Sequence, residues 1–306
     1  MGDVERPHPT ELHAHQVDVH GVYQIWNRYK SGARAVRHFG GRNPVRVHAG
    51  ATVGNPQLAR ADFRSEIHFM VRNGIEQSRR FIYIEDQYFW HIEMARWLGE
   101  RVRDGRIKEL VIVTNMETGL AEHPPHTRLA LQHLAHRAHG HTDRILVFER
   151  IGTHGRYVHS KMFIYDDVSA HVGSANFNQR GYSHDSESAG VWVDRVLGQT
   201  SWDMVGASLA RKLRVKLWEK HLGVPTRHLF DALGAMKYWH ALAEQTGAPT
   251  ALVAGAAAPS VHPVVIDGQR WSQWARHQSE EPPWDVTVMH GDPFSVEPHD
   301  WIVDPA

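Results

Sequence analysis

The sequence predicts an α/β fold in which helices cover a sheet, and three observations support this prediction. From Asn55 to Glu149, helix-like and strand-like segments alternate, an order typical of a parallel sheet with helical crossovers. Residues 156–194 contain three more strand-like segments, which are joined by turns rather than by helices. Residues 201–221 carry apolar side chains at helical spacing. From about Gly247 the chain is rich in Ala, Pro and Trp, which predicts an irregular C-terminal tail.

Each predicted element rests on a local pattern. Asn55-Pro56 is a helix-start signal, because asparagine caps the first turn and proline fits its first position. Short runs of β-branched and aromatic residues predict buried strands, and a glycine after a periodic apolar segment predicts a helix end. The first 55 residues show no strong period and are predicted to be irregular. The expected helices are residues 55–80, 90–104, 124–139, 201–221 and 229–245, and the expected strands are residues 81–85, 109–115 and 144–149 with the three segments joined by turns.

Composition excludes several classes of site. The 306 residues contain no cysteine, so disulfides, thiolate metal sites and cysteine nucleophiles are excluded. Lys+Arg and Asp+Glu both total 34, and this balance argues against nucleic acid as a partner. No apolar run approaches the ~20 residues that span a bilayer, and the polar start lacks the apolar core of a signal peptide. By default, these features predict a cytoplasmic protein.

Residues 157–187 carry the pattern that indicates chemistry. His159, Lys161 and Asp166 form the motif H-x-K-x-x-x-x-D. Alternate residues of a strand share a face, so His159 and Lys161 project together while Ser160 turns the other way. An imidazole beside an ammonium suits a phosphate, since the cation binds its non-bridging oxygens while the imidazole attacks phosphorus or donates a proton. The alternative is a β-hairpin whose His, Lys and Asp are surface polar residues.

A second polar segment lies downstream of this motif. Gly173 follows a short strand and permits a tight turn with close backbone approach. The Ser174 hydroxyl and the Asn176 amide can donate hydrogen bonds to the same phosphate. Asp185 and Glu187 come later, and a carboxylate on the far ring nitrogen of a histidine would fix its tautomer and stabilise the imidazolium.

These motifs resemble the C-terminal half of the phospholipase D superfamily, the HKD enzymes. The resemblance rests on HSKMFIYDD, GSANFNQRG and DSE, and the flanking blocks IYIEDQYFW and LRVKLWEKHLG favour phospholipase D itself. It implies a phospholipase D-like mixed sheet flanked by helices. The expected domains are residues 1–64, a remnant of a preceding repeat or an irregular N-terminal segment, residues 65–223, a catalytic repeat with one HKD motif, and residues 224–306, a C-terminal helix and irregular tail.

The resemblance implies metal-independent cleavage of a phosphodiester, without a cofactor, by two HKD motifs that face each other across one site. One histidine attacks phosphorus and forms a phosphohistidine. The other protonates the leaving alcohol and then activates water or a second alcohol. In this chain His159 matches the acid and base, and Lys161 and Asn176 match the phosphate binders, with Ser174 as a further substrate contact. Glu187, or alternatively Asp185, matches the carboxylate that orients a histidine. Asp166 matches the motif aspartate, whose role is more structural than chemical.

Only one H-x-K motif occurs in the chain, whereas the family uses two. A single histidine is poorly placed to be both nucleophile and leaving-group acid in one step. Three explanations stay open: the chain is a fragment, a homodimer brings two copies of His159 together, or a separate partner supplies the first HKD half.

We therefore expect phospholipase D-type hydrolysis or transphosphatidylation of a phospholipid such as phosphatidylcholine, with transient contact to a membrane surface. In this reaction the chain would supply the second HKD motif. Two alternatives remain. One is a homodimeric nuclease-like phosphodiesterase. The other is a catalytically incompetent half that acts only with a partner.

Histidines outside the motif could suggest a metal centre. His133, His136 and His139 recur every three residues on one predicted helix. Successive steps of three drift around a helix, and no adjacent carboxylate completes a ligand set, so we expect no metal site there.

The helix predicted for residues 201–221 carries an apolar stripe and a basic face. The stripe consists of Trp202, Val205, Leu209, Leu213 and Leu217, and the basic face of Arg211, Lys212, Arg214, Lys216 and Lys220. We expect the stripe to be buried and the basic face to be solvated. Contact of the basic face with anionic lipid headgroups is the alternative.

Overall fold

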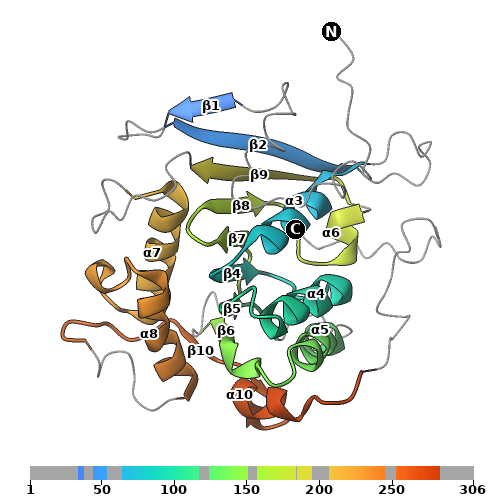
Figure 1. Ribbon diagram of the computed structural model, residues 1–306, viewed down its shortest axis with the longest axis vertical. Coiled ribbons are helices and arrows are strands. Elements are labelled where there is room, and N and C mark those ends of the chain that lie inside the picture. Colours follow the sequence, from blue (N-terminus) through green and yellow to red (C-terminus); the bar gives the residue numbers. More distant parts are fainter. Residues whose placement is uncertain are drawn as a thin grey trace.

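The protein is described by a computed structural model that covers residues 34–37, 44–53, 64–116, 124–150, 157–183, 185–194, 207–244 and 253–282. Within these ranges one mixed sheet lies between two helical layers (Figure 1), which confirms the predicted α/β fold with a mixed sheet. The strands are β1 (Arg34–Arg37), β2 (Pro44–Val53), β3 (Arg64–Ser65), β4 (Phe81–Asp86), β5 (Glu109–Val113), β6 (Ile145–Arg150), β7 (Lys161–Tyr165), β8 (Ser169–Gly173), β9 (Glu187–Asp194), β10 (Val261–Pro263), β11 (Val265–Ile266) and β12 (Gln269–Arg270).

The direction of each strand follows from its connection. The sheet has the order β1-β2-β9-β8-β7-β4-β5-β6-β10, with β3 paired to β2, and β11 and β12 form a separate two-stranded sheet. Strands β4, β5 and β6 are parallel. Strand β7 is antiparallel to β4, and the antiparallel pairing continues through β8, β9, β2 and β1. Parallel neighbours need crossover connections, whereas turns are enough to join antiparallel ones.

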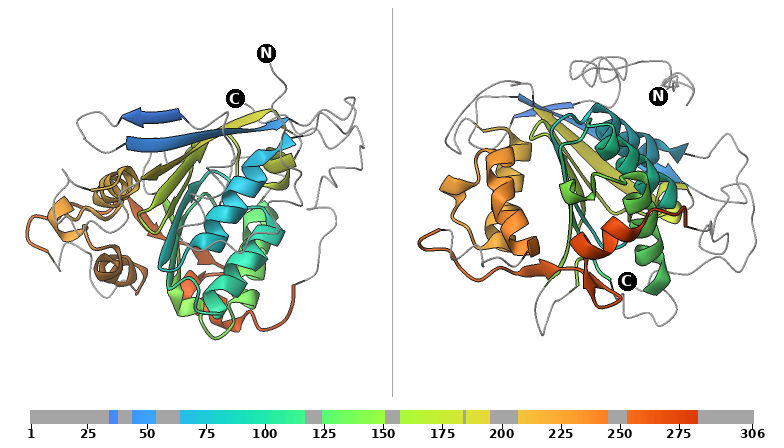
Figure 2. Two further views of the ribbon diagram at one scale, coloured as in Figure 1. Left: turned by 45° about the horizontal axis from the view of Figure 1, so that its top comes forward. Right: turned by 60° about the horizontal axis from the view of Figure 1, so that its bottom comes forward.

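Helices cover both faces of the sheet, as the two views in Figure 2 show. Helices α3, α4, α5 and α10 contribute to one apolar cluster, and α7 and α8 contribute to the other. None of the described helices is long and apolar enough to cross a bilayer. The helices are α3 (Glu66–Gln77), α4 (Ile92–Arg103), α5 (Pro124–Arg137), α6 (Gln179–Ser183), α7 (Leu209–Leu222), α8 (Ala232–Glu244) and α10 (Trp271–Trp274), with 3-10 turns η2 (Thr142–Arg144), η3 (Thr226–His228) and η4 (Ala275–His277).

Strand β4 shows how the two layers share the sheet. Ile82 and Ile84 pack into the cluster formed with α3, α4 and α5. Phe81 and Tyr83 point to the other face, where both rings lie against Trp218 of α7. A strand buried on both faces has a continuous apolar run rather than an alternating one, which explains the run FIYI.

Two regions that the sequence predicts to be irregular contain strands of this sheet. Strands β1 and β2 lie within the first 55 residues, and β2 pairs with β9 over eight residues. In the tail, β10 pairs with β6, and Trp271 of α10 is buried with its indole N–H donating to the carbonyl of Ile145 at 2.7 Å. Pairing with distant strands decides these elements, because β propensity depends strongly on tertiary context. Residues 1–33 and 283–306 lie outside the described part.

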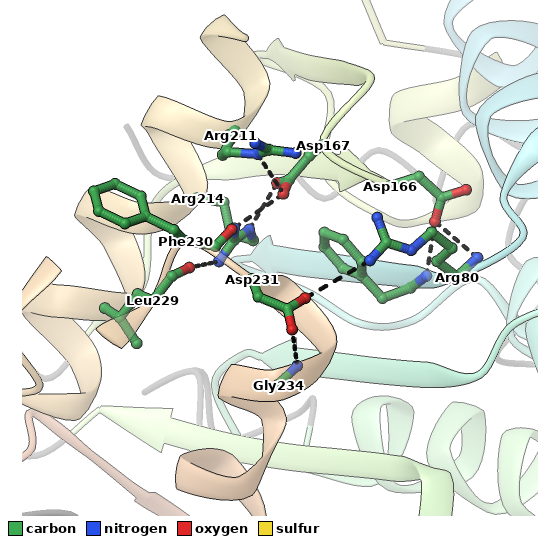
Figure 3. A network of polar contacts seen from close by, with 10 residues as sticks. Arg80, Asp166, Asp167, Arg211, Arg214, Leu229, Phe230, Asp231 and Gly234 are labelled. Atoms are coloured by element: carbon green, nitrogen blue, oxygen red, sulfur yellow. Dashed lines mark hydrogen bonds and ion pairs between the residues drawn. The ribbon is translucent and has the colours of Figure 1, made fainter. Parts of the chain in front are cut away.

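Helix α7 buries a different face from the predicted leucine stripe. Its buried residues include Arg214, Val215 and Trp218, whereas the leucines of the predicted stripe that fall in α7 are only partly buried. Arg214 was expected on the solvated face but is fully buried, because its guanidinium forms an ion pair with Asp167 at 2.6 Å (Figure 3). Trp202 and Val205 of the predicted stripe lie outside the described residues.

Candidate active site

The predicted phosphate-binding residues gather where strands β4 and β5 end. Strand β7 runs antiparallel to β4, and the register pairs its first residue, Lys161, with Asp86, the last residue of β4. Strand β8 ends at Gly173, and β9 begins with Glu187 at the same edge of the sheet. The alternating strand directions therefore bring segments that are far apart in sequence to one edge. In open α/β sheets this carboxyl edge is where ligands bind.

His159 and Lys161 differ sharply in burial, and only Lys161 belongs to strand β7. The Lys161 side chain is buried, and its ammonium donates to Oε1 of Gln87 at 2.5 Å and to the carbonyl oxygen of His159 at 3.0 Å. His159 is exposed, and its ring stacks on that of Tyr157 with centroids 6.1 Å apart. Gln87 also donates to the Tyr157 hydroxyl. The buried ammonium of Lys161 thus lies against the backbone of His159, whose side chain is accessible.

Asn115, which follows β5, holds the segment that contains His159. Its Oδ1 accepts the backbone N–H of Val158 at 2.8 Å, and its Nδ2 donates to the carbonyls of Val158 at 2.9 Å and of Gln87 at 3.0 Å. Residues 157–160 are not part of a strand and lack the backbone hydrogen bonds of a sheet. The bonds to Asn115 satisfy part of this backbone instead. The backbone before His159 is therefore fixed although the imidazole is exposed.

Ser174 and Glu187 contact each other at the ends of β8 and β9. The Ser174 hydroxyl donates to the Glu187 carboxylate and accepts the backbone N–H of Ser188 at 3.0 Å. The strands approach closely here, because a Cβ added to Gly173 would lie 2.6 Å from the Cβ of Ala189. Glycine is therefore required sterically before Ser174, as the predicted close backbone approach indicates.

Asp86 fixes the turn that carries Asn176. Its Oδ1 accepts the backbone N–H groups of Tyr88 and Phe177, each at 3.0 Å. The Phe177 carbonyl in turn accepts the N–H of Trp90 at 2.9 Å. Asn176 is buried directly before this anchor. Burial raises the pKa of Asp86 to about 8, because desolvation outweighs the two backbone N–H donors and nearby Lys161.

An Asp86→Asn variant is expected to remove a pH dependence of stability. The folded-state pKa lies above the ordinary value of 3.8, so the native protein holds a proton that the unfolded chain releases. The associated stability is fully present below about pH 4 and is lost as pH rises toward 8, at about 1.4 kcal/mol per pKa unit. Asparagine accepts the same N–H groups but does not ionise. Thermal unfolding should therefore show the stability of the variant, relative to the wild type, rising from pH 5 to pH 8. Parallel pH profiles for both proteins would contradict this.

Asp166 lies away from the other predicted site residues, and the carboxylate of Asp185 pairs with an arginine. Asp166 lies in the turn after β7, at the opposite edge of the sheet from Lys161. Its carboxylate accepts the backbone N–H groups of residues 79, 80 and 81 at 2.7, 2.9 and 2.7 Å. Asp185 precedes β9 and forms an ion pair with Arg180 at 2.7 Å. The contacts of Asp166 are those of a structural residue.

An Asp166→Ala variant is expected to lower the free energy of unfolding by about 2–4 kcal/mol. It leaves three backbone donors without their acceptor and places alanine at a φ of 54°. Urea denaturation measures the loss. Asp166→Asn is the matched control, since asparagine tolerates this φ and keeps one acceptor oxygen, so it should lose less. Equal losses would show that the carboxylate contacts contribute little.

Several of these supporting side chains were not predicted as site residues from the sequence. Asp86, Gln87 and Asn115 lie outside the H-x-K and G-S-x-N patterns, and each acts on a residue far along the chain. The available signal is positional: polar residues directly follow apolar strand runs, at the edge where α/β sheets place their ligands.

Short stretches of the chain are similar to phospholipases D. The chain is 44% identical over 73 residues to phospholipase D C of Dictyostelium discoideum, which covers 22% of this chain and 4% of that protein. It is 35% identical over 97 residues to phospholipase D A of the same organism, which covers 30% and 7%. Phospholipase D zeta 2 of Arabidopsis thaliana is 38% identical over 79 residues, 24% of this chain and 8% of that protein. The chain thus spans less than a tenth of each of these relatives.

The other comparisons are weaker. No protein-family model matches the chain. Among solved structures, a phospholipase D family member, Nuc from Salmonella typhimurium, aligns with a TM-score of 0.37 and 17% identity over 49% of this chain and 84% of that chain. The sequence similarity to three phospholipases D confirms the resemblance of this chain to the phospholipase D superfamily.

Proposed function

We propose that this chain takes part in phospholipase D-type cleavage of a phosphodiester, with His159 as acid and base. The observation that carries the proposal is the exposed side chain of His159, whose backbone carbonyl accepts a hydrogen bond from the buried ammonium of Lys161. Both lie at the edge of the sheet that also holds Ser174 and Asn176. Lys161 binds the non-bridging oxygens of the phosphate, which would otherwise repel a nucleophile.

The reaction proceeds in two displacements and uses a second histidine. That histidine attacks phosphorus and forms an N–P bond, while the P–O bond to the leaving alcohol breaks and His159 gives its proton to the leaving oxygen. His159 then removes a proton from water or a second alcohol. The resulting oxygen nucleophile attacks phosphorus, and the N–P bond breaks. Water gives hydrolysis, and an alcohol gives transphosphatidylation.

The second histidine lies outside these 306 residues and comes from a preceding segment of a longer chain, from a second copy of this chain, or from a partner that carries the first HKD motif. This sequence contains one H-x-K motif, and its His159 is exposed rather than buried among its own elements. The similarity to phospholipases D favours a phospholipid such as phosphatidylcholine as the substrate.

The test compares activity with assembly state. Purified protein is separated by size, and each fraction is assayed with bis-(p-nitrophenyl) phosphate and with phosphatidylcholine vesicles. We expect turnover in a self-associated fraction or after a partner is added, and none in His159→Ala. His139→Ala is the matched control, because His139 is also exposed but follows α5, and it should retain full activity.

Each remaining outcome excludes part of the proposal. Activity that survives His159→Ala overturns the site, and activity in a clean monomer overturns the need for a second chain. Turnover of nucleic acid rather than lipid favours the nuclease-like alternative. Absence of turnover in every assembly and with every partner favours an incompetent half.

A further inference from the structure

A buried hydrogen-bond network lies behind the His159–Lys161 segment, on the side of the sheet that faces α7. Its centre is the carboxylate of Glu85 in β4. Oε1 accepts the Ser160 hydroxyl at 2.5 Å, and Oε2 accepts the Tyr83 hydroxyl at 2.7 Å. The ring of His221, from the last turn of α7, contacts Oε2 through Nε2 at 2.9 Å. The network therefore joins Ser160, the residue between His159 and Lys161, to helix α7.

The donor roles of His221 follow from its two partners. The carboxylate of Glu85 only accepts, so Nε2 donates to it. On the other side, Nδ1 lies 3.1 Å from the hydroxyl of Ser260, which is also 3.1 Å from the Lys220 carbonyl. The Ser260 hydroxyl thus fixes the orientation of the ring. With Nε2 donating to a carboxylate, His221 forms a charge-assisted hydrogen bond with Glu85.

The Glu85 carboxylate and the His221 ring are buried, so the charge loses its hydration and needs hydrogen-bond partners from the protein. The side chains of His221 and Glu85 are 1% and 10% exposed. Burial alone would raise the pKa of Glu85, but the hydrogen bonds from His221, Ser160 and Tyr83 together lower it to about 2. A charge that is buried and bonded on all sides fixes the positions of its partners, because any shift would leave it unpaired.

Ser160 is the partner through which this pair reaches the candidate active site. Asn115 already holds the backbone of Val158 on one side of His159. The Glu85 carboxylate holds Ser160 on the other side. His159 is thus an exposed side chain between two fixed neighbours, and Lys161 follows directly.

We propose that Glu85 and His221 are positioning residues, which hold Ser160 so that His159 and Lys161 face the same phosphate. The proposal rests on the proposed function and adds to it the elements that set the geometry of the motif. Neither side chain touches substrate. Their effect on the reaction passes through the backbone of residues 159–161, where small displacements of reacting groups have large effects on rate.

The experiment removes one link at a time. Ser160→Ala deletes the contact to Glu85 and leaves the Glu85–His221 pair in place, and His221→Gln weakens the pair itself. Ser78→Ala is the matched control: its hydroxyl donates to the Gly74 carbonyl at 2.8 Å and lies before β4, at the opposite edge of the sheet. The protein is used as the full chain, in the assembly that shows turnover.

Two readouts distinguish the inference from the proposed function. Steady-state kinetics should show kcat lowered about ten- to a hundredfold in Ser160→Ala and His221→Gln, with KM little changed and Ser78→Ala unaffected. NMR of the histidine ring protons, with the His159 signal identified by its loss in His159→Ala, requires no turnover. It should show a moved His159 signal, and an altered response to inorganic phosphate, in the same two variants.

The outcomes separate clearly. If the wild type has no activity in any assembly, the proposed function fails, while a displaced His159 signal still supports the positioning role. An unmoved His159 signal in both Ser160→Ala and His221→Gln overturns the inference, even if the enzyme is active. An equal displacement in Ser78→Ala also overturns it, because the effect would then be a general loss of order.

Discussion

An Arg214→Leu variant is expected to be less stable than the wild type by about 3–5 kcal/mol. The Arg214 guanidinium is fully buried and binds both oxygens of Asp167, at 2.6 and 2.9 Å. It also donates to the carbonyls of Leu229 at 2.7 Å and Phe230 at 3.0 Å (Figure 3). Leucine replaces only the apolar stem and leaves a buried carboxylate and two carbonyls without these donors, so the cost exceeds that of the lost bonds. Urea denaturation followed by circular dichroism measures the difference.

Arg211→Leu is the matched control for this variant. Arg211 is in the same helix and contacts the same carboxylate at the longer distance of 3.3 Å, and its side chain is 20% exposed. Its loss should cost about 1 kcal/mol or less. An Arg214→Lys variant should remain strongly destabilised, since an ammonium does not reproduce the bidentate hydrogen bonding of a guanidinium to the Asp167 carboxylate. Similar stabilities of the Arg211 and Arg214 variants would argue against a dominant buried pair.

A Lys161→Met variant is expected to lower kcat/KM for a phosphodiester by about 10²- to 10³-fold. The buried ammonium is fixed by Gln87 and by the carbonyl of His159, so in the proposed reaction it acts on the phosphate without reorganising. Methionine keeps most of the apolar stem and removes the charge. The measurement is steady-state turnover of bis-(p-nitrophenyl) phosphate by the active assembly, together with the affinity for inorganic phosphate.

The control for Lys161 is Lys216→Met. The Lys216 side chain is 63% exposed and pairs with Glu219 within α7. This variant should match the wild type in turnover and in phosphate affinity. Wild-type turnover in Lys161→Met would show that the ammonium is structural, and the phosphate would then have to be bound elsewhere.

The alternating part of the fold could be predicted because its signals are local. Helices α4 and α5 and strands β4, β5 and β6 lie within a few residues of the segments that apolar periodicity and glycine positions predict. The buried face of α7 could not be predicted in this way, because a charged residue normally marks the solvated side of a helix. Arg214 is buried only because Asp167, 47 residues away, supplies a matching charge.

The candidate site divides in the same way. The residues of H-x-K and G-S-x-N are visible as short patterns, but the strand predicted through His159 begins only at Lys161. Their supports depend on strand order. Asn115 reaches Val158 and Glu85 reaches Ser160 because β7 lies next to β4 and β4 next to β5, an order that the chain does not reveal in sequence.

The turn between β7 and β8 has a consequence for how the protein opens. Its adjacent residues Asp166 and Asp167, with φ of 54° and 60°, point to different layers. Asp166 holds the segment between α3 and β4, and Asp167 holds α7 through Arg214. Neither layer can separate from the sheet without disturbing this one turn. Amide hydrogens of α3 and α7 should therefore exchange with deuterium as one cooperative unit, at a rate set by global unfolding.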